Sequence, residues 1–169
     1  GSVIDGVEIR YQIRKTNGDW QYNTQDYLLG MPEKRNYVVG IAAVSETEAY
    51  AHASVGGSNV WGDIRFWELG TPPALQSGDW SGIWRADLDT RMRSRNGMIY
   101  FASANAFTRN NIVFSMAPAG PDLFAQLQDN AQIHDQGSSY RGNPDIAVDP
   151  SGAAHLIYGA FQEIFYNRY

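Results

Sequence analysis

Three arginines occupy positions from which they could bind an acidic ligand. Arg35, Arg85 and Arg141 each lie a few residues upstream of a segment with the apolar pattern of a buried strand. A guanidinium group binds a carboxylate through paired hydrogen bonds. If these strands are equivalent members of a repeat, the arginines converge on one end of the fold. The alternative is that they are solvated loop residues, since their distances to the strands differ.

Aromatic side chains near the same segments fit a sugar ligand. The apolar face of a pyranose stacks on an indole or phenol ring, while amides and guanidinium groups bind its hydroxyls. Trp61, Trp84 and Tyr140 lie in predicted loops or at predicted strand starts and are the candidates, with packing as the alternative role. Trp20 and Trp80 each follow a Gly-Asp pair, and we expect them to pack between repeats.

Residues that would carry catalysis or hold a metal do not form a recognisable set. The chain contains no phosphate-binding Gly-rich loop and no Gly-x-Ser-x-Gly elbow. Two of the histidines, His52 and His155, occupy matching second-strand positions of a repeat, and we expect these two to be packed, hydrogen-bonded residues. No catalytic residue, metal ligand or cofactor is therefore predicted. The histidines are His52, His134 and His155.

Four carboxylates that flank the strands could serve as acid, base or calcium ligands. They are Asp87, Asp89, Asp145 and Asp149. The segment Asp149-Pro150-Ser151-Gly152 is typical of a turn in which the Asp side chain binds the backbone two residues on. We therefore expect a structural role for these carboxylates.

Composition and charge narrow the possible partners. The 169 residues include 13 basic and 18 acidic side chains, so a formal charge of -5 disfavours binding to nucleic acid or to an anionic membrane surface. The longest apolar run, Tyr37 to Val44, is far too short for a membrane span. Cysteine is absent, which leaves a secreted or cell-surface location open but does not establish it. The segment 91–96 contains three arginines and is predicted to be a solvated hairpin tip, or else a contact for an acidic partner.

A repeat of about fifty residues runs through the chain. Third-strand isoleucines at positions 9, 64, 112 and 164 are separated by 55, 48 and 52 residues. A four-stranded propeller blade has a period of roughly 40–50 residues. Many turn-forming and aromatic residues also favour an all-β fold. We predict one domain, 1–169, with a partial blade at 7–36, blades at 37–83 and 84–135, and an incomplete blade at 140–169. Around Leu123 and Leu127 a short helix or irregular loop is expected instead of a strand.

Two segments resemble the bacterial sialidase-like, Asp-box (BNR-type) β-propellers. The segment 144–159, from Pro144-Asp145-Ile146 to Tyr158-Gly159, is similar to that family's inner strand, turn and second strand. The segment Thr16-Asn17-Gly18-Asp19-Trp20 resembles a degenerate Asp-box turn, with the Asp displaced past the Gly. The resemblance implies a propeller fold and an arginine cluster for an acidic sugar. The family's tyrosine nucleophile, its partner Glu and its acid/base Asp match no position here, which argues against a complete sialidase.

The blade count implies that the domain is incomplete by itself. About three blades cannot close a ring, because propellers have four to eight. We expect either self-association, with a homodimer closing a ring of about six blades, or the remainder of a longer chain. The alternative fold is a β-sandwich. The expected function is a non-catalytic, glycan-binding module. The alternatives are a sialidase-like glycoside hydrolase fragment or half-site, and a structural assembly subunit.

Overall fold

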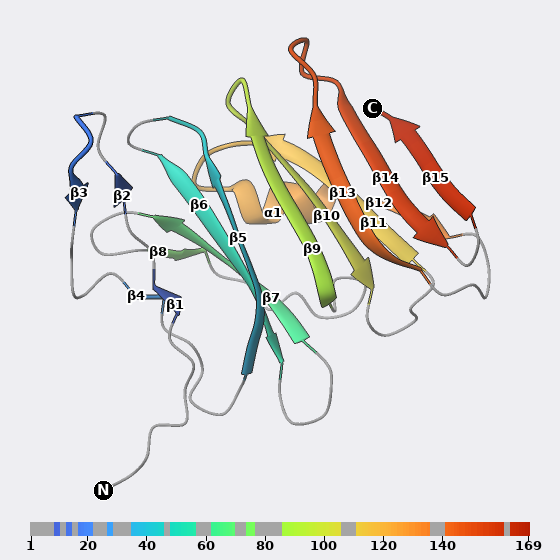
Figure 1. The fold of residues 1–169 in the computed structure, drawn as a ribbon, viewed down its shortest axis with the longest axis horizontal. Coiled ribbons are helices and arrows are strands. Elements are labelled where there is room, and N and C mark those ends of the chain that lie inside the picture. The colour runs from blue at the N-terminus through green and yellow to red at the C-terminus, as the bar shows by residue number, and fades with distance from the viewer. Residues whose placement is uncertain are drawn as a thin grey trace, which may run out of the picture.

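The computed structural model confirms an all-β fold: the described part of the chain is β-strand apart from turns, short connections and one short helix (Figure 1). The structure describes residues 9–10, 13–14, 17–21, 27–28, 35–45, 48–56, 62–69, 74–76, 86–105, 111–135, 141–160 and 163–169. Most of these residues belong to three antiparallel meanders that follow one another along the chain. Two short strand pairs precede them: β1 (Ile9–Arg10) with β4 (Tyr27–Leu28), and β2 (Ile13–Arg14) with β3 (Trp20–Gln21).

In the described part of the chain, the first two meanders have four strands each. The first meander contains β5 (Arg35–Ala43), β6 (Ala49–Gly56), β7 (Gly62–Leu69) and β8 (Ala74–Gln76), each paired with the next. The second contains β9 (Ala86–Arg95), β10 (Met98–Asn105), β11 (Asn111–Pro118) and β12 (Gln132–Asp135). A single backbone pair, Gly62 with Ala86, links the two into one continuous sheet.

The third meander has three strands in the described part of the chain. They are β13 (Arg141–Val148), β14 (Ala154–Ala160) and β15 (Glu163–Arg168). Here β15 pairs with β14 on one side, and no described strand pairs with its other side.

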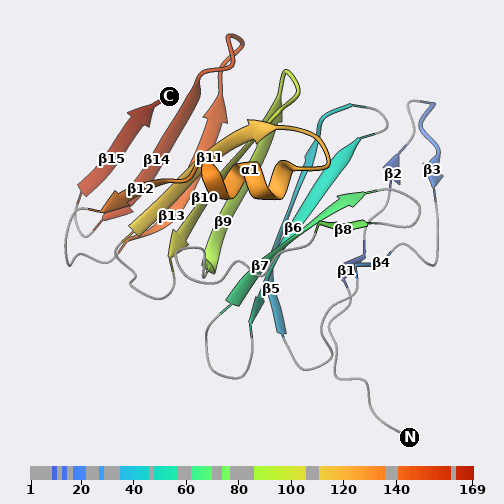
Figure 2. The same ribbon diagram turned by 180° about the vertical axis from the view of Figure 1, so that it is seen from behind.

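The helix expected near Leu123 is present, but it does not replace a strand. Helix α1 (Leu123–Asp129) lies between β11 and β12, and β12 pairs with β11 as a fourth strand. Its apolar side, with Leu123, Phe124 and Leu127, is buried. The Ser115 hydroxyl donates a 2.6 Å hydrogen bond to the Leu127 carbonyl, which ties the helix to β11. Figure 2 shows α1 between the first and second meanders.

The meanders stack face to face, so the second is buried on both sides. Alternate residues of a strand point to opposite faces. Ile99 and Phe101 of β10 pack toward the first meander, whereas Tyr100 and Ala102 pack toward the third. The first core also contains Ala42, Tyr50, Met92, Val113 and Ala117, and the second contains Ala104, Ile112, Phe114, Ile146, Ala154, Leu156 and Tyr158.

The first strands of the three meanders lie side by side. Strand β9 contacts both β5 and β13 along its length, and all three run in the same direction in Figure 1. The Ser94 hydroxyl donates a hydrogen bond to the Ala43 carbonyl near the ends of β9 and β5. Arg93 of β9 is paired with Asp145 of β13. The three strands therefore form a continuous inner layer.

His52 fixes the contact between the first and second meanders. It is fully buried on β6, and its Nε2 lies 2.7 Å from Thr90 Oγ1 on β9. Its ring also meets the Phe101 ring edge to face. Burial, with a smaller effect from Arg91, lowers the pKa of His52 to about 3, so the imidazole is neutral in the folded protein. The prediction that His52 is a packed, hydrogen-bonded residue is confirmed.

Gly40 makes room for this histidine, which gives a stability prediction. Gly40 is the backbone partner of His52, and a Cβ at position 40 would lie 2.8 Å from Nδ1 of the ring and closer still to Cε1. Because the ring is held by Thr90 and Phe101, it cannot move aside cheaply. We expect Gly40→Ala to lower the free energy of unfolding by roughly 1–3 kcal/mol in urea titrations.

The matched control is Gly159→Ala on β14, where an added Cβ has no atom within 4 Å. This control is expected to be close to wild type. Equal stability of the two variants would contradict the crowding at position 40.

Candidate functional site

The predicted ligand-binding residues fall at the beginnings of strands. Arg35 is the first residue of β5 and Arg141 is the first residue of β13. Arg85 immediately precedes β9 in the sequence, but Arg85, Trp61, Trp84 and Tyr140 lie outside the described residues. Strands β5, β9 and β13 all begin at the lower edge in Figure 1. The backbone therefore brings the starts of these strands to one edge, which we call the strand-start edge.

Strand β7 begins at the same edge. Its first residue, Gly62, is paired with Ala86, the first residue of β9. In the sequence Trp61 directly precedes Gly62, Trp84 and Arg85 directly precede Ala86, and Tyr140 directly precedes Arg141. All six candidates are thus within two residues of a strand start at this edge.

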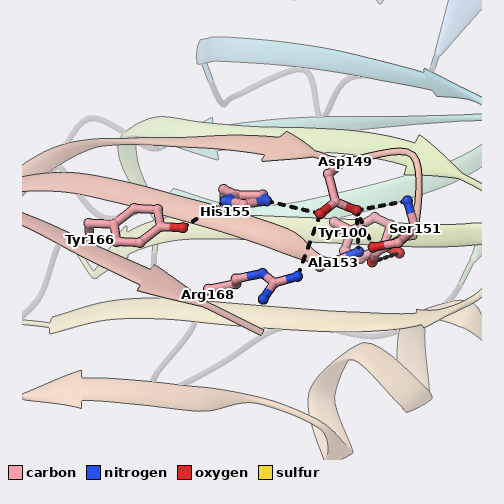
Figure 3. A network of polar contacts seen from close by, with 8 residues as sticks. Tyr100, Asp149, Ser151, Ala153, His155, Tyr166 and Arg168 are labelled. Carbon is pink, nitrogen blue, oxygen red and sulfur yellow. Dashed lines mark hydrogen bonds and ion pairs between the residues drawn. The ribbon is translucent and has the colours of Figure 1, made fainter.

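A second candidate site surrounds Asp149, in the turn between β13 and β14 (Figure 3). Its Oδ1 accepts hydrogen bonds from the Ser151 backbone at 2.8 Å, the Ser151 hydroxyl at 2.6 Å and the Ala153 backbone at 3.0 Å. Gly152, with φ of 93°, closes the turn. The sequence prediction that Asp149 is a turn residue is confirmed.

The other oxygen of Asp149 binds basic side chains. Oδ2 lies 3.3 Å from His155 Nε2 and 3.8 Å from Arg168 Nη2. The hydrogen bond from Ser151, followed by those from His155 and Ala153, lowers the pKa of Asp149 well below its ordinary value despite some desolvation. The carboxylate is therefore ionised at neutral pH and acts only as an acceptor.

The Asp149 carboxylate determines which ring nitrogen of His155 carries the hydrogen. Because Asp149 can only accept, His155 Nε2 carries the hydrogen between them. In the neutral imidazole Nδ1 then accepts, and the Tyr166 hydroxyl donates to it across 2.8 Å. The order Tyr166, His155, Asp149 matches that of a hydroxyl, a base and an orienting acid. The two hydrogen bonds orient the His155 ring between the Tyr166 hydroxyl and the Asp149 carboxylate.

The network of Tyr166, His155 and Asp149 does not lie at the strand-start edge. His155 and Tyr166 lie on the outer face of the third meander, the side away from the second, and the Tyr166 side chain is 60% exposed. Asp149 follows the end of β13, whereas Arg141 begins it. The two candidate sites are therefore at opposite ends of the third meander.

Tyr100 links the Asp149 turn to the second meander. Its hydroxyl donates a 2.9 Å hydrogen bond to the Gly152 carbonyl. Burial first, and then the Asp149 charge, raise the pKa of Tyr100 above its ordinary value, so it remains a neutral donor. The turn is thus held from both sides, by its own Asp149 and by a buried tyrosine of β10.

The remaining sequence candidates have structural contacts. Asp145 lies 3.3 Å from Arg93 and accepts a hydrogen bond from the Ile146 backbone, so it links two strands. Asp87 and Asp89 belong to β9, but their side chains are outside the description. His134 Nε2 forms a hydrogen bond with the Tyr169 hydroxyl. Sequence reasoning missed Tyr166 and Arg168, because only the strand register places them beside His155 and Asp149.

Neither metal chemistry nor a known relative helps to identify the site. Within the described ranges, no three His, Asp or Glu side chains are grouped as a metal site would need. Nor does that part of the chain include a helix long and apolar enough to cross a membrane. Comparison with protein-family models, with curated proteins and with solved structures found no match to the chain.

The lowered pKa of Asp149 gives a prediction for acid stability. A carboxyl group with a depressed pKa in the folded state stabilises the protein above its unfolded pKa of about 4, and this contribution is lost as the pH falls below that value. Asp149→Asn should be less stable than wild type at neutral pH, and the difference should shrink below about pH 4. Urea unfolding at a series of pH values measures both effects.

Asp122→Asn is the control, since this carboxylate at the start of α1 makes no capping hydrogen bond. If the gap between wild type and Asp149→Asn were the same from neutral pH to about pH 2, the contacts of Asp149 would not depend on its charge.

Proposed function

We propose that the chain is a non-catalytic, propeller-type binding module whose ligand is a glycan and whose ring is completed by a second copy. The stacking of the meanders supports the propeller part of this proposal. Each meander places its first strand in the inner layer, and neighbouring meanders share apolar cores. Radially arranged blades of antiparallel strands have this organisation.

The strand-start edge carries the functional part of the proposal. The starts of β5, β7, β9 and β13 lie along the same edge (Figure 1), and arginine or aromatic residues stand at or just before each of them in the sequence. Arginines suit carboxylates and hydroxyls, and aromatic rings suit the apolar face of a sugar. An edge where several strand ends meet, with loops between them, is also a common place for a ligand site.

The non-catalytic part of the proposal is supported by the position of the polar network around Asp149. The described hydrogen-bonded network of Tyr166, His155 and Asp149 lies at the other end of the third meander. A glycosidase needs two carboxyl groups on either side of the scissile bond, or an equivalent nucleophile. The first residues of β5, β9 and β13 are Arg35, Ala86 and Arg141. The nearest carboxyl residues in the sequence are Asp63 of β7 and Asp87 of β9, whose side chains lie outside the description.

Self-association is supported by exposed apolar side chains on the two ends of the stack. Ile164 is 77% exposed and Ile157 is 45% exposed on the outer face of the third meander. Ile41 is 58% exposed on the opposite end, where the first meander faces away from the second. Contiguous exposed apolar residues mark interaction surfaces. The outer face of the third meander in one copy can cover that of the first meander in another.

A glycan array combined with glycosidase assays tests the function. We expect saturable binding to a subset of glycans, with no turnover of fluorogenic glycosides including a sialoside. Arg35→Gln and Arg141→Gln should each weaken that binding by about tenfold, because each removes a charge-assisted contact. Arg14→Gln on β2 is the control and should bind as wild type does.

Turnover that is abolished by Arg141→Gln would replace the binding module with a glycoside hydrolase half-site. An array without any bound glycan would favour the structural assembly subunit, which the exposed isoleucines also suit.

A further inference from the structure

The arginines of segment 91–96 line a strand instead of a hairpin tip. Strand β9 continues through Arg95, and the turn itself is Asn96 and Gly97, both with positive φ. Met92 is buried in the first core, whereas Arg91, Arg93 and Arg95 alternate with it and are at least partly exposed. Alternation along the strand places the three arginines on one face, which we call the arginine strip.

Asp145 shows how the arginine strip binds a carboxylate. Asp145 Oδ1 lies 3.3 Å from Arg93 Nη2 and 4.0 Å from Arg91 Nε, so a single oxygen sits between two guanidinium groups. Both arginines also donate to carbonyl groups of their own strand, Arg91 to Thr90 at 2.8 Å and Arg93 to Met92 at 3.0 Å. These bonds hold the guanidinium groups against β9.

Two residues further along β9 and β13, the described residues do not repeat this contact between a carboxylate and an arginine. Strands β9 and β13 run side by side in the same direction, so the residue two beyond Asp145 lies beside the residue two beyond Arg93. Those residues are Ala147, which is exposed, and Arg95. Among the residues that the structure describes, no carboxylate pairs with Arg95. Asp149, in the following turn, is engaged by Ser151, His155 and Arg168.

We infer that Arg93 and Arg95 bind the carboxylate of a ligand from outside the chain, at the position that Ala147 leaves open. Asp145 serves as the internal example of the contact. Two arginines whose Cα atoms are about 7 Å apart along a strand can turn their guanidinium groups toward one carboxylate and share it through charge-assisted hydrogen bonds. This site is independent of the proposed glycan site, since it lies toward the far ends of β9 and β13 from the strand-start edge.

Arginine side-chain NMR tests the inference on the whole chain. Signals of the Nε–Hε groups in ¹⁵N-labelled protein are followed during titration with acetate, glucuronate and glucose at constant ionic strength. We expect saturable shifts of the Arg93 and Arg95 signals with both carboxylates and none with glucose. Much tighter binding of glucuronate than of acetate identifies an acidic sugar as the source of the carboxylate, and equal binding identifies a free acid.

Substitutions at the open position make the test specific. Ala147→Asp supplies an internal carboxylate and should weaken acetate binding by at least about tenfold, whereas Ala147→Asn, of the same size, should not. Arg95→Gln should weaken it by about tenfold as well. The inference is overturned if all arginine signals shift together without saturation, or if Ala147→Asp binds acetate as tightly as Ala147→Asn. Neither outcome bears on glycan binding at Arg35 and Arg141.

Discussion

Burial of the second meander on both faces is the constraint on which the rest of the structure depends. Ile99 and Phe101 belong to one core, and Tyr100 and Ala102 belong to the other. Because the side-chain period of a strand is two, a slip of one residue in β10 would exchange the two sets and disrupt both cores. The register of this one strand therefore determines which of its side chains enter each of the two cores.

The sequence predicted the strands well but not the contacts between them. The apolar runs around Ile41, Ile99 and Leu156 all form strands, because local alternation is enough to define them. The turn role of Asp149 was predictable for the same local reason. By contrast, Arg93 and Asp145 are 52 residues apart, and only tertiary packing brings them together. The polar face of β9 was mistaken for a turn because an exposed strand face and a loop share the same composition.

The two ends of the inner layer carry different functional groups. The strand-start edge combines Arg35 and Arg141 with neighbouring aromatic residues in the sequence. The other end carries the arginine strip and the Asp149 turn, which Tyr100 anchors to β10. None of the candidate arginines could be ranked from the sequence, because their value for binding depends on which strand ends meet in space.

We propose that the stack is an open set of blades that a second copy completes. Light scattering after size-exclusion chromatography tests it most directly. The account predicts a mass of twice 18.8 kDa, and a shift toward the single-chain mass in Ile164→Glu, which places a charge on the exposed face of the third meander. A single-chain mass for the wild type at a concentration of about 100 µM, well above an ordinary micromolar dimer constant, would contradict it.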